Sequence, residues 1–408
     1  MPSTKAKHLR RPHVATGTLA LLALLASIAG LAPNCAIAET PALPQIAALL
    51  PLSGPHKDLG QAARDGLEWA RDALPMPVEL IVHDSLGTPE GAAQAVDTLA
   101  TMHPNLIAII GPIGQIESAA AAARAMELAI PILLLTSAEN SEDATQGVFR
   151  LRLSPEAQAR ALGTFTVHQL NATQAAIFYP DNAYGTTCAQ AYAAALLQAG
   201  GTLHAIEAYP PRQPNDATAA ELLTGKRTRQ LTTTSQSPTP KASTQRHKKA
   251  QIAFDVLFIP DNASRVVRVL SALKAAGWPT SKIQLLGTSA WLAGSLRGTT
   301  AATGALILDI CDLQRDQPSR DRYDDFYATF DRPPTELEGQ AHDALLVAVS
   351  ALRRCPRAPS RECLLQALKS GATWPGVCGG FRLNPQGAIL RDVFVYEVDD
   401  QGRPWPTQ

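Results

Sequence analysis

Short polar side chains recur at the places where apolar, strand-length stretches of the sequence end. Their hydroxyl, amide and carboxylate groups can hydrogen-bond a small molecule. Each residue alone could equally cap a helix, so the argument depends on their recurrence at successive strand ends. The candidate ligand-binding residues are Ser53, Gly54, Gln115, Thr136, Ser137, Tyr184, Asp261 and Ser289. These residue types favour binding over catalysis.

The turn Ser53-Gly54-Pro55 joins a strand-like run to an amphipathic helix. A phosphate-binding loop needs several glycines and a G-K-[ST] sequence, and a dinucleotide fold needs G-x-G-x-x-G after its first strand. Neither pattern occurs here, and Pro55 removes a backbone donor. A serine hydroxyl and a helix N-terminus remain, which suit an anionic or polar small ligand.

Sequence signatures of catalysis and metal binding are absent. There is no G-x-S-x-G, and the histidines after residue 38 show no H-E-x-x-H or similar metal spacing. These histidines are His56, His83, His103, His168, His204, His247 and His342. His342 and Asp343 lie in a helix pattern, where a surface or packing role is simpler than a catalytic pair. We therefore expect the protein to have no enzymatic activity and to bind no metal and no cofactor.

Strand-length apolar runs alternate with helix-period segments from residue 46 onward. The runs are almost uniformly apolar, which is typical of a parallel sheet buried on both faces. The pattern restarts after a crossover-like segment at residues 148–162. It therefore predicts an α/β fold of two Rossmann-like lobes, with ligands beyond the carboxyl ends of the strands.

The expected domain boundaries follow this restart. Lobe 1 covers residues 39–154 and lobe 2 covers residues 155–303. Residues 304–408 form crossover helices and a C-terminal β-hairpin, turned at Asn384-Pro385-Gln386-Gly387, and part of 304–399 returns to lobe 1.

The first 38 residues differ in kind from the rest. A basic stretch precedes an apolar run and an Ala-Ile-Ala site at residues 36–38, which is the order of a cleaved secretory signal peptide. A membrane anchor is the alternative, weakened by Thr18, Ser27 and Gly30 within the run. Residues 1–38 carry four Lys and Arg and no acid, so cleavage leaves 32 basic and 36 acidic residues, a net charge of −4. A net charge this close to zero does not indicate that the protein binds nucleic acid.

Residues 225–251 interrupt the pattern. Between residues 226 and 249 there are seven Lys and Arg and no acid, with Leu231 the one sizeable apolar side chain. Such a segment buries too little to order itself, which predicts a disordered basic insertion in lobe 2. A solvated tether is the simpler role, and contact with an anionic polymer is the alternative.

Five cysteines follow residue 38, in a compartment where disulfides persist. Cys355 and Cys363 bracket a Pro-containing loop and could close it, with Cys363 to Cys378 as the alternative. Cys188 lies in a helix pattern and Cys311 follows a strand pattern, which indicates that both are buried thiols. The absence of C-x-x-C argues against a redox or zinc motif.

Seven stretches spread over residues 44–399 carry a resemblance to one known family: IAALLPLSGPHKDLGQAARDGLEWA, IAIIGP, IPILLLTS, YPDNAYG, FDVLFIPDNAS, LLGTSAW and EGQAHDALLVA. In order and wording they resemble the type I periplasmic binding proteins, in particular the leucine/isoleucine/valine-binding family. The resemblance implies two lobes joined by about three crossovers and closing on a ligand. It further implies a monomeric periplasmic receptor that delivers a small polar, amino-acid-like or related solute to an ABC permease.

The resemblance places the ligand between Ser53, Gln115, Thr136 and Ser137 on one lobe and Tyr184, Asp261 and Ser289 on the other. Amino-acid binders carry a serine at the position of Gln115 and an acid near Ser289. Both departures argue against an ordinary amino-acid ligand.

A second branch of the same fold is the alternative. The stretches ILLLTSAE, GVFRLRLSPEAQARAL and FDVLFIPDNASRVVRV resemble the penicillin-binding-protein activators. That resemblance implies a periplasmic regulator whose partner is a cell-wall synthase.

Overall fold

The computed structural model describes residues 43–408 except 139–140, 212–216, 235–236, 247–251, 279–281, 293–295, 297–299, 392 and 408. The expected signal peptide, residues 1–38, lies outside this part. Within it, no helix is both long and apolar enough to cross a membrane.

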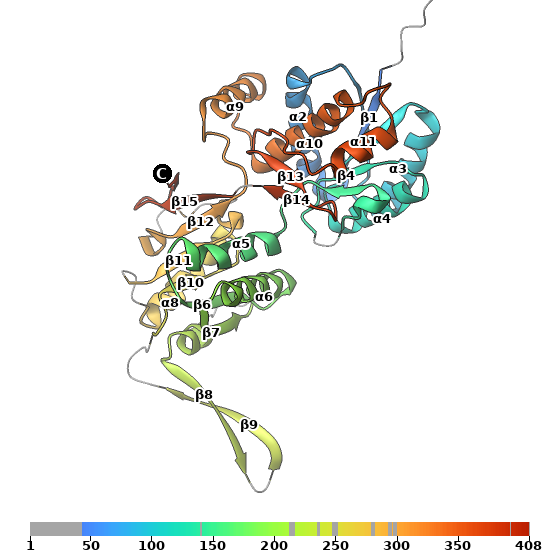
Figure 1. Cartoon of the computed structure of the whole chain (residues 1–408). Helices are drawn as coiled ribbons and strands as arrows, with labels where there is room; N and C mark the ends of the chain where they lie inside the picture. Colours follow the sequence, from blue (N-terminus) through green and yellow to red (C-terminus); the bar gives the residue numbers. More distant parts are fainter. Residues whose placement is uncertain are drawn as a thin grey trace, which may run out of the picture. The chain divides into compact units, whose positions relative to one another are not determined.

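The first sheet is parallel throughout and forms the centre of lobe 1 (Figure 1). Its strands stand in the order β2-β1-β3-β4-β5. They are β1 (Gln45–Leu50), β2 (Glu79–Asp84), β3 (Leu106–Ile110), β4 (Ile132–Leu134) and β5 (Val148–Arg150). The helices between them are α2 (Lys57–Ala70), α3 (Pro89–Met102) and α4 (Gln115–Glu127). Apolar side chains on the two faces of β1 belong to separate core clusters, as a doubly covered sheet requires.

The second sheet forms lobe 2 and has the order β16-β15-β12-β11-β10-β6-β7. Its parallel strands are β6 (Gln174–Pro180), β7 (Thr202–Tyr209), β10 (Val256–Phe258), β11 (Gln284–Gly287) and β12 (Leu306–Asp309). Two antiparallel strands, β15 (Phe394–Val398) and β16 (Pro404–Pro406), complete it. The lobe's helices are α5 (Pro155–His168), α6 (Ala183–Gln198), α7 (Ala217–Leu223) and α8 (Ala263–Ala275). The α/β prediction is confirmed, and this sheet extends past the expected lobe boundary at residue 303.

The segment between β12 and β15 returns to lobe 1. Its helices are α9 (Gln317–Phe330), α10 (Glu336–Arg353) and α11 (Arg361–Lys369). Helix α10 packs closely on α2, where a Cβ on Gly66 would lie 2.3 Å from the backbone oxygen of Glu338. The expected hairpin forms between β13 (Phe381–Leu383) and β14 (Ile389–Arg391). The chain therefore crosses between the lobes three times, after β5, after β12 and after β14.

The basic insertion contains paired strands. Strand β8 (Arg227–Thr234) and strand β9 (Ser237–Arg246) form an antiparallel two-stranded ribbon (Figure 1). The prediction of disorder is wrong over these strands. Backbone groups of the two strands hydrogen-bond one another, and the many threonines of the segment favour extended backbone.

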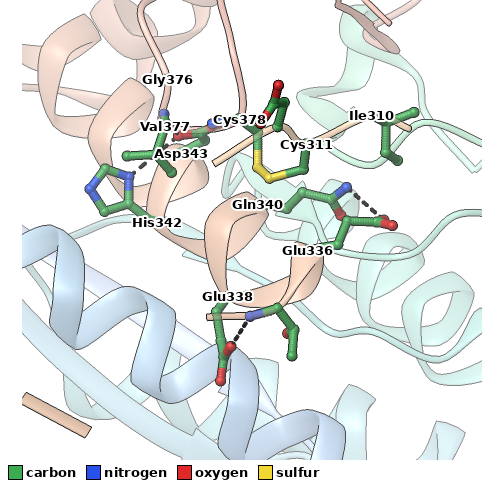
Figure 2. The surroundings of a disulfide bond; sticks show 12 residues. Ile310, Cys311, Glu336, Glu338, Gln340, His342, Asp343, Gly376, Val377 and Cys378 are labelled. Atoms are coloured by element: carbon green, nitrogen blue, oxygen red, sulfur yellow. Dashed lines mark hydrogen bonds and ion pairs between the residues drawn. A yellow bond between two sulfur atoms is a disulfide. The ribbon is translucent and has the colours of Figure 1, made fainter. Parts of the chain in front are cut away.

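Two disulfides lie near the returning segment. One joins Cys355 to Cys363, and the other joins Cys311, just after β12, to Cys378 (Figure 2). The interpretation of Cys311 as a thiol is therefore wrong. Its sulfur meets Cys378 beside Gly339, where a Cβ would lie 2.6 Å from the Cys378 sulfur. Cys188 is a buried free thiol, and burial raises its pKa to about 12.

Asp309 ends β12 and is buried beside the second crossover. Its Oδ1 accepts hydrogen bonds from the backbone N–H of Ile310 (2.6 Å) and of Cys311 (3.2 Å). Burial, followed by the negative charge of Glu336 on α10, raises the pKa of Asp309 to about 7. The group therefore titrates near neutrality within the folded protein.

We expect the free energy of unfolding to depend on the protonation of Asp309. Between its unfolded pKa near 4 and its folded pKa of about 7, the native state holds the extra proton, so stability falls as pH rises through this window. Asp309→Asn mimics the protonated acid and should flatten the profile, removing about 2 kcal/mol of loss between about pH 5 and about pH 8. Urea unfolding of both proteins at the two pH values measures this. Parallel profiles would contradict it.

Candidate functional site

Polar residues gather at the carboxyl edge of the lobe-1 sheet. Ser53 follows β1, Gln115 follows β3, and Thr136 and Ser137 follow β4. Because β1, β3 and β4 are adjacent and parallel, their carboxyl ends meet at one edge. The structure thus brings the four predicted lobe-1 residues to the same edge.

Gly54 allows the first turn to form. Its φ is +76°, a left-handed conformation that glycine adopts without steric cost. A Cβ added there would lie 3.1 Å from the backbone oxygen of Leu86, which belongs to the loop after β2. Gly54 therefore lets two neighbouring strand-end loops approach each other.

Asp84 ties these two loops together. Its Oδ1 accepts from the backbone N–H of Leu52 (2.9 Å) and of Leu86 (2.8 Å). Burial alone would raise the pKa of Asp84. Hydrogen bonds from the Ser53 side chain and from three backbone N–H groups outweigh burial and hold the pKa below its ordinary value. Asp84 is thus an ionised group at the edge where Ser53 lies.

A buried carboxylate occupies the N-terminus of α4. Glu117 is 3% exposed, and its Oε1 accepts from the backbone N–H of Gly114 (2.7 Å). Its Oε2 accepts from the hydroxyl of Ser85, the residue after Asp84 (2.8 Å). Gln115, the first residue of α4, is exposed. The loops after β2 and β3 are therefore joined through Glu117.

Thr136 and Ser137 differ in exposure. Thr136 is buried, and its Oγ1 accepts from the backbone N–H of Ala138 (3.2 Å). Ser137 is half-buried. The Thr136 oxygen holds the turn after β4, so Ser137 is the more accessible hydroxyl of the two.

In lobe 2 the predicted tyrosine and aspartate lie near each other. The Tyr184 hydroxyl is 3.0 Å from Oγ1 of Thr288. The Tyr209 hydroxyl donates to Oδ2 of Asp261 (2.7 Å), and Arg265 lies 3.9 Å from the same oxygen. Burial raises the pKa of Tyr184, and the charge of Asp261 adds to this shift. Tyr184 therefore stays protonated, with a carboxylate nearby.

Ser289 is held by a helix of its own lobe. Its backbone N–H and its hydroxyl both donate to Oε1 of Gln158 on α5, at 3.1 Å and 3.0 Å. The loop after β11 is thereby anchored to α5 just beyond the first crossover. Gln158 thus sets the position of Ser289.

Sequence reasoning missed four residues of these edges: Asp84, Glu117, Gln158 and Tyr209. Asp84 ends a strand that the sequence pattern predicts, so its position at the carboxyl edge could have been predicted as well. Glu117, three residues after Gly114, matched an N-terminal capping position. Tyr209 and Gln158 act through partners far along the chain, which no local signal reveals.

His342 is buried, and its ring packs 4.6 Å from that of Trp69, which fits the expected packing role. Within the described residues, no group of three or more His, Cys, Asp and Glu could hold a metal ion. A cavity of about 430 Å³ is lined by α5, by the β13–β14 hairpin and by Arg150, the last residue of β5, and none of the predicted site residues lines it.

A comparison with known protein families covers most of the chain. The periplasmic binding protein model matches residues 44–403. The chain belongs to the periplasmic binding protein family. This membership implies a periplasmic location and a solute-binding role. The curated proteins include no significant match to the sequence of this periplasmic binding protein.

Solved structures share the fold. A putative branched-chain amino acid ABC transporter protein from Rhodospirillum rubrum is 18% identical, with a TM-score of 0.74, covering 90% of this chain and 100% of that one. A substrate-binding protein from Desulfitobacterium hafniense in complex with Leu is 21% identical, with a TM-score of 0.65, covering 89% and 99%. One from Rhodopseudomonas palustris in complex with 3,4-dihydroxy benzoic acid is 14% identical, with a TM-score of 0.63, covering 89% and 96%. At these levels of sequence identity, the similarity shows that the fold is shared.

Proposed function

We propose that this periplasmic binding protein captures a small polar solute, amino-acid-like or related, between its lobes and delivers it to the membrane permease of an ABC transporter. The observation that carries the proposal is the gathering of polar side chains at the carboxyl edge of each sheet, within a family of solute-binding proteins. Solved relatives named for ABC transporters, with leucine or a benzoic acid bound, support it.

The proposed site combines Ser53, Gly54, Gln115, Thr136 and Ser137 from lobe 1 with Tyr184, Asp261 and Ser289 from lobe 2. Three crossovers between lobes suit a hinge that closes on a ligand. A cleaved signal peptide at residues 1–38 would export the protein, which would act as a monomer without catalysis.

The regulator of cell-wall synthesis remains an alternative function. The three structures compared above are all described as parts of ABC transporters, so they do not favour it. Its partner would be a synthase rather than a solute, and it would need no ligand between the lobes.

Native mass spectrometry of residues 39–408, purified from the periplasm without refolding, tests the proposed function. A discrete small-molecule mass that is released when the protein unfolds supports solute capture, because a ligand bound only by the native state must leave on unfolding. A ligand-free protein that binds a cell-wall synthase in pull-downs would favour the alternative.

We expect Ser53→Ala to weaken binding of the captured solute about three- to tenfold, the cost of one hydrogen bond. The thermal midpoint of the ligand-free protein should change little, because Asp84 keeps its backbone donors. Calorimetric titration measures the affinity. If the variant and the parent bind the solute with equal affinity, Ser53 does not contribute to binding.

A further inference from the structure

We propose that lobe 2 docks on an anionic phospholipid surface through a basic end formed by residues 202–282. This stretch runs from the start of β7 to the loop before β11, and it includes α7, the β8–β9 ribbon, β10 and α8. Figure 1 shows the ribbon extending from lobe 2 past β7. The inference goes beyond the proposed function, because it concerns where the protein is held rather than which solute it captures.

The charges of the protein are divided unevenly between this end and the rest. Of the 32 basic and 36 acidic residues after residue 38, residues 202–282 hold twelve basic and five acidic, a net charge of +7. The remaining 20 basic and 31 acidic residues give the rest of this part a net charge of −11. An anionic surface therefore attracts this end of lobe 2 and repels the remainder, which favours one orientation of approach.

The acidic residues within the basic end do not cancel its charge. Glu221 of α7 pairs with Arg227 at 2.9 Å, and Asp261 lies 3.9 Å from Arg265. The other acids are Glu207, Asp255 and Asp216, the last of which lies outside the described residues. With all five acids counted as ionised, seven positive charges are still in excess.

The register of the ribbon places arginines together. Arg227 of β8 stands directly opposite Arg246 of β9, and Arg229 is two residues further along β8. These three positions share one face of the ribbon, because residues alternate between faces along a strand. Like charges in directly opposite positions destabilise a pair of strands. The ion pair of Arg227 with Glu221 offsets part of this repulsion, and an anionic surface would offset more.

The ribbon and α8 belong to the same basic end. Nζ of Lys226, the residue before β8, donates to the backbone oxygen of Ala275 at the end of α8 (3.4 Å). Helix α8 contains no acidic residue, and its Arg268 and Lys274 are exposed. Lys282, in the loop after α8, is exposed as well. Basic residues that are distant in sequence therefore contribute to one region of lobe 2.

The side chains of this end favour a lipid surface over a nucleic acid or a protein partner. Its aromatic residues are all buried: Tyr209, Phe254, Phe258 and Trp278. Single-stranded nucleic acids are held by stacking on aromatic rings, and the centres of protein interfaces are enriched in aromatic side chains. Among the described residues of the stretch, Ile206 is the one large apolar side chain that is exposed. Anionic headgroups require only clustered Lys and Arg.

Co-sedimentation of residues 39–408 with lipid vesicles tests the proposal. This protein omits the apolar run of residues 1–38, which could itself enter a bilayer, and the chain from residue 43 onward is one compact unit. We expect binding to vesicles of phosphatidylcholine and phosphatidylglycerol in equal amounts, and none to phosphatidylcholine alone. Raising the salt from about 0.05 M to about 0.5 M should release the protein, because salt screens the attraction.

The triple variant Arg229→Gln, Lys241→Gln, Arg246→Gln locates the binding surface. Its affinity for the anionic vesicles should fall about thirty- to hundredfold, since each charge near such a surface contributes about three- to fivefold. The matched control is Arg64→Gln, Arg71→Gln, Lys369→Gln, which removes three exposed charges from lobe 1 and gives the same net charge. The control should bind nearly as well as the parent.

Equal losses in the two triple variants would overturn the assignment to lobe 2, because binding would then depend on net charge alone. Equal binding to neutral and anionic vesicles, or no binding to either at low salt, would overturn the proposal. Binding to isolated peptidoglycan but not to vesicles would overturn it in favour of a cell-wall polymer.

A second variant covers the case in which the ribbon substitutions prevent folding. Lys274→Gln, Lys282→Gln removes two exposed charges near the start of the ribbon and should weaken vesicle binding about tenfold. Affinity equal to that of the parent would contradict a docking surface at this end of lobe 2. Solute capture is measured separately, so failure of the proposal would leave the proposed function standing.

Discussion

Asp343→Ala should lower the free energy of unfolding by about 3–5 kcal/mol, because it leaves a buried guanidinium without its partner. Asp343 and Arg391 form an ion pair of 2.9 Å, and their side chains are 2% and 1% exposed. Asp343 also accepts hydrogen bonds from the backbone N–H of Val377 (2.7 Å) and of Cys378 (3.3 Å) (Figure 2). One carboxylate thus joins α10, the chain before the hairpin and the third crossover.

Urea unfolding followed by circular dichroism measures this loss. The control is Glu156→Ala, which removes an exposed i,i+4 pair with Arg160 and should cost less than about 1 kcal/mol. A similar small cost for both variants would contradict the structural role of Asp343. Replacing Asp343 and Arg391 together by Leu and Met should recover part of the loss, because no unpaired charge remains buried.

Removing the Cys311–Cys378 disulfide is expected to cost about 4 kcal/mol. The bond closes a loop with a sequence separation of 67, and constraint of the unfolded chain grows with loop length. The double variant Cys311→Ser, Cys378→Ser therefore should unfold at clearly lower urea concentration than the parent. The shorter Cys355–Cys363 loop, with a separation of 8, should cost only about 2.5 kcal/mol when opened.

The comparison of the two double-serine variants under non-reducing conditions is the measurement. Adding a reductant to the parent protein should abolish its greater stability against urea relative to both variants. A larger loss for Cys355→Ser, Cys363→Ser would contradict the chain-constraint account and place the effect in native packing instead.

Much of the fold could be predicted because the information was local. Uniformly apolar runs identified the parallel strands, and the Asn384–Gly387 turn identified the β13–β14 hairpin. Cys355 and Cys363 lie on either side of a short loop, so the sequence near them was enough to suggest that they pair. The lobe boundary at residue 303 was harder, because β15 enters the lobe-2 sheet from far along the chain and pairs antiparallel with β12.

The errors also have physical reasons. Low hydrophobicity predicted disorder for the basic insertion, but its threonines favour extended backbone and its two strands hydrogen-bond one another. Cys311 follows a buried strand and looked like an apolar thiol. Its partner, Cys378, lies 67 residues further along the chain, and the two sulfurs meet beside Gly339 of α10, which no local pattern could reveal.

The sequence by itself determined the strand and helix pattern, the α/β class and the strand ends at which polar residues gather. These properties follow from periodicity, turn residues and caps, which act within a few residues. Only the tertiary structure decided which polar groups share a network and what charge they leave. Ser85 meets Glu117, Tyr209 meets Asp261 and Gln158 meets Ser289 across separations of 32, 52 and 131 residues. Such pairings depend on sheet order and helix packing, because electrostatic balance is set by distance in space rather than along the chain.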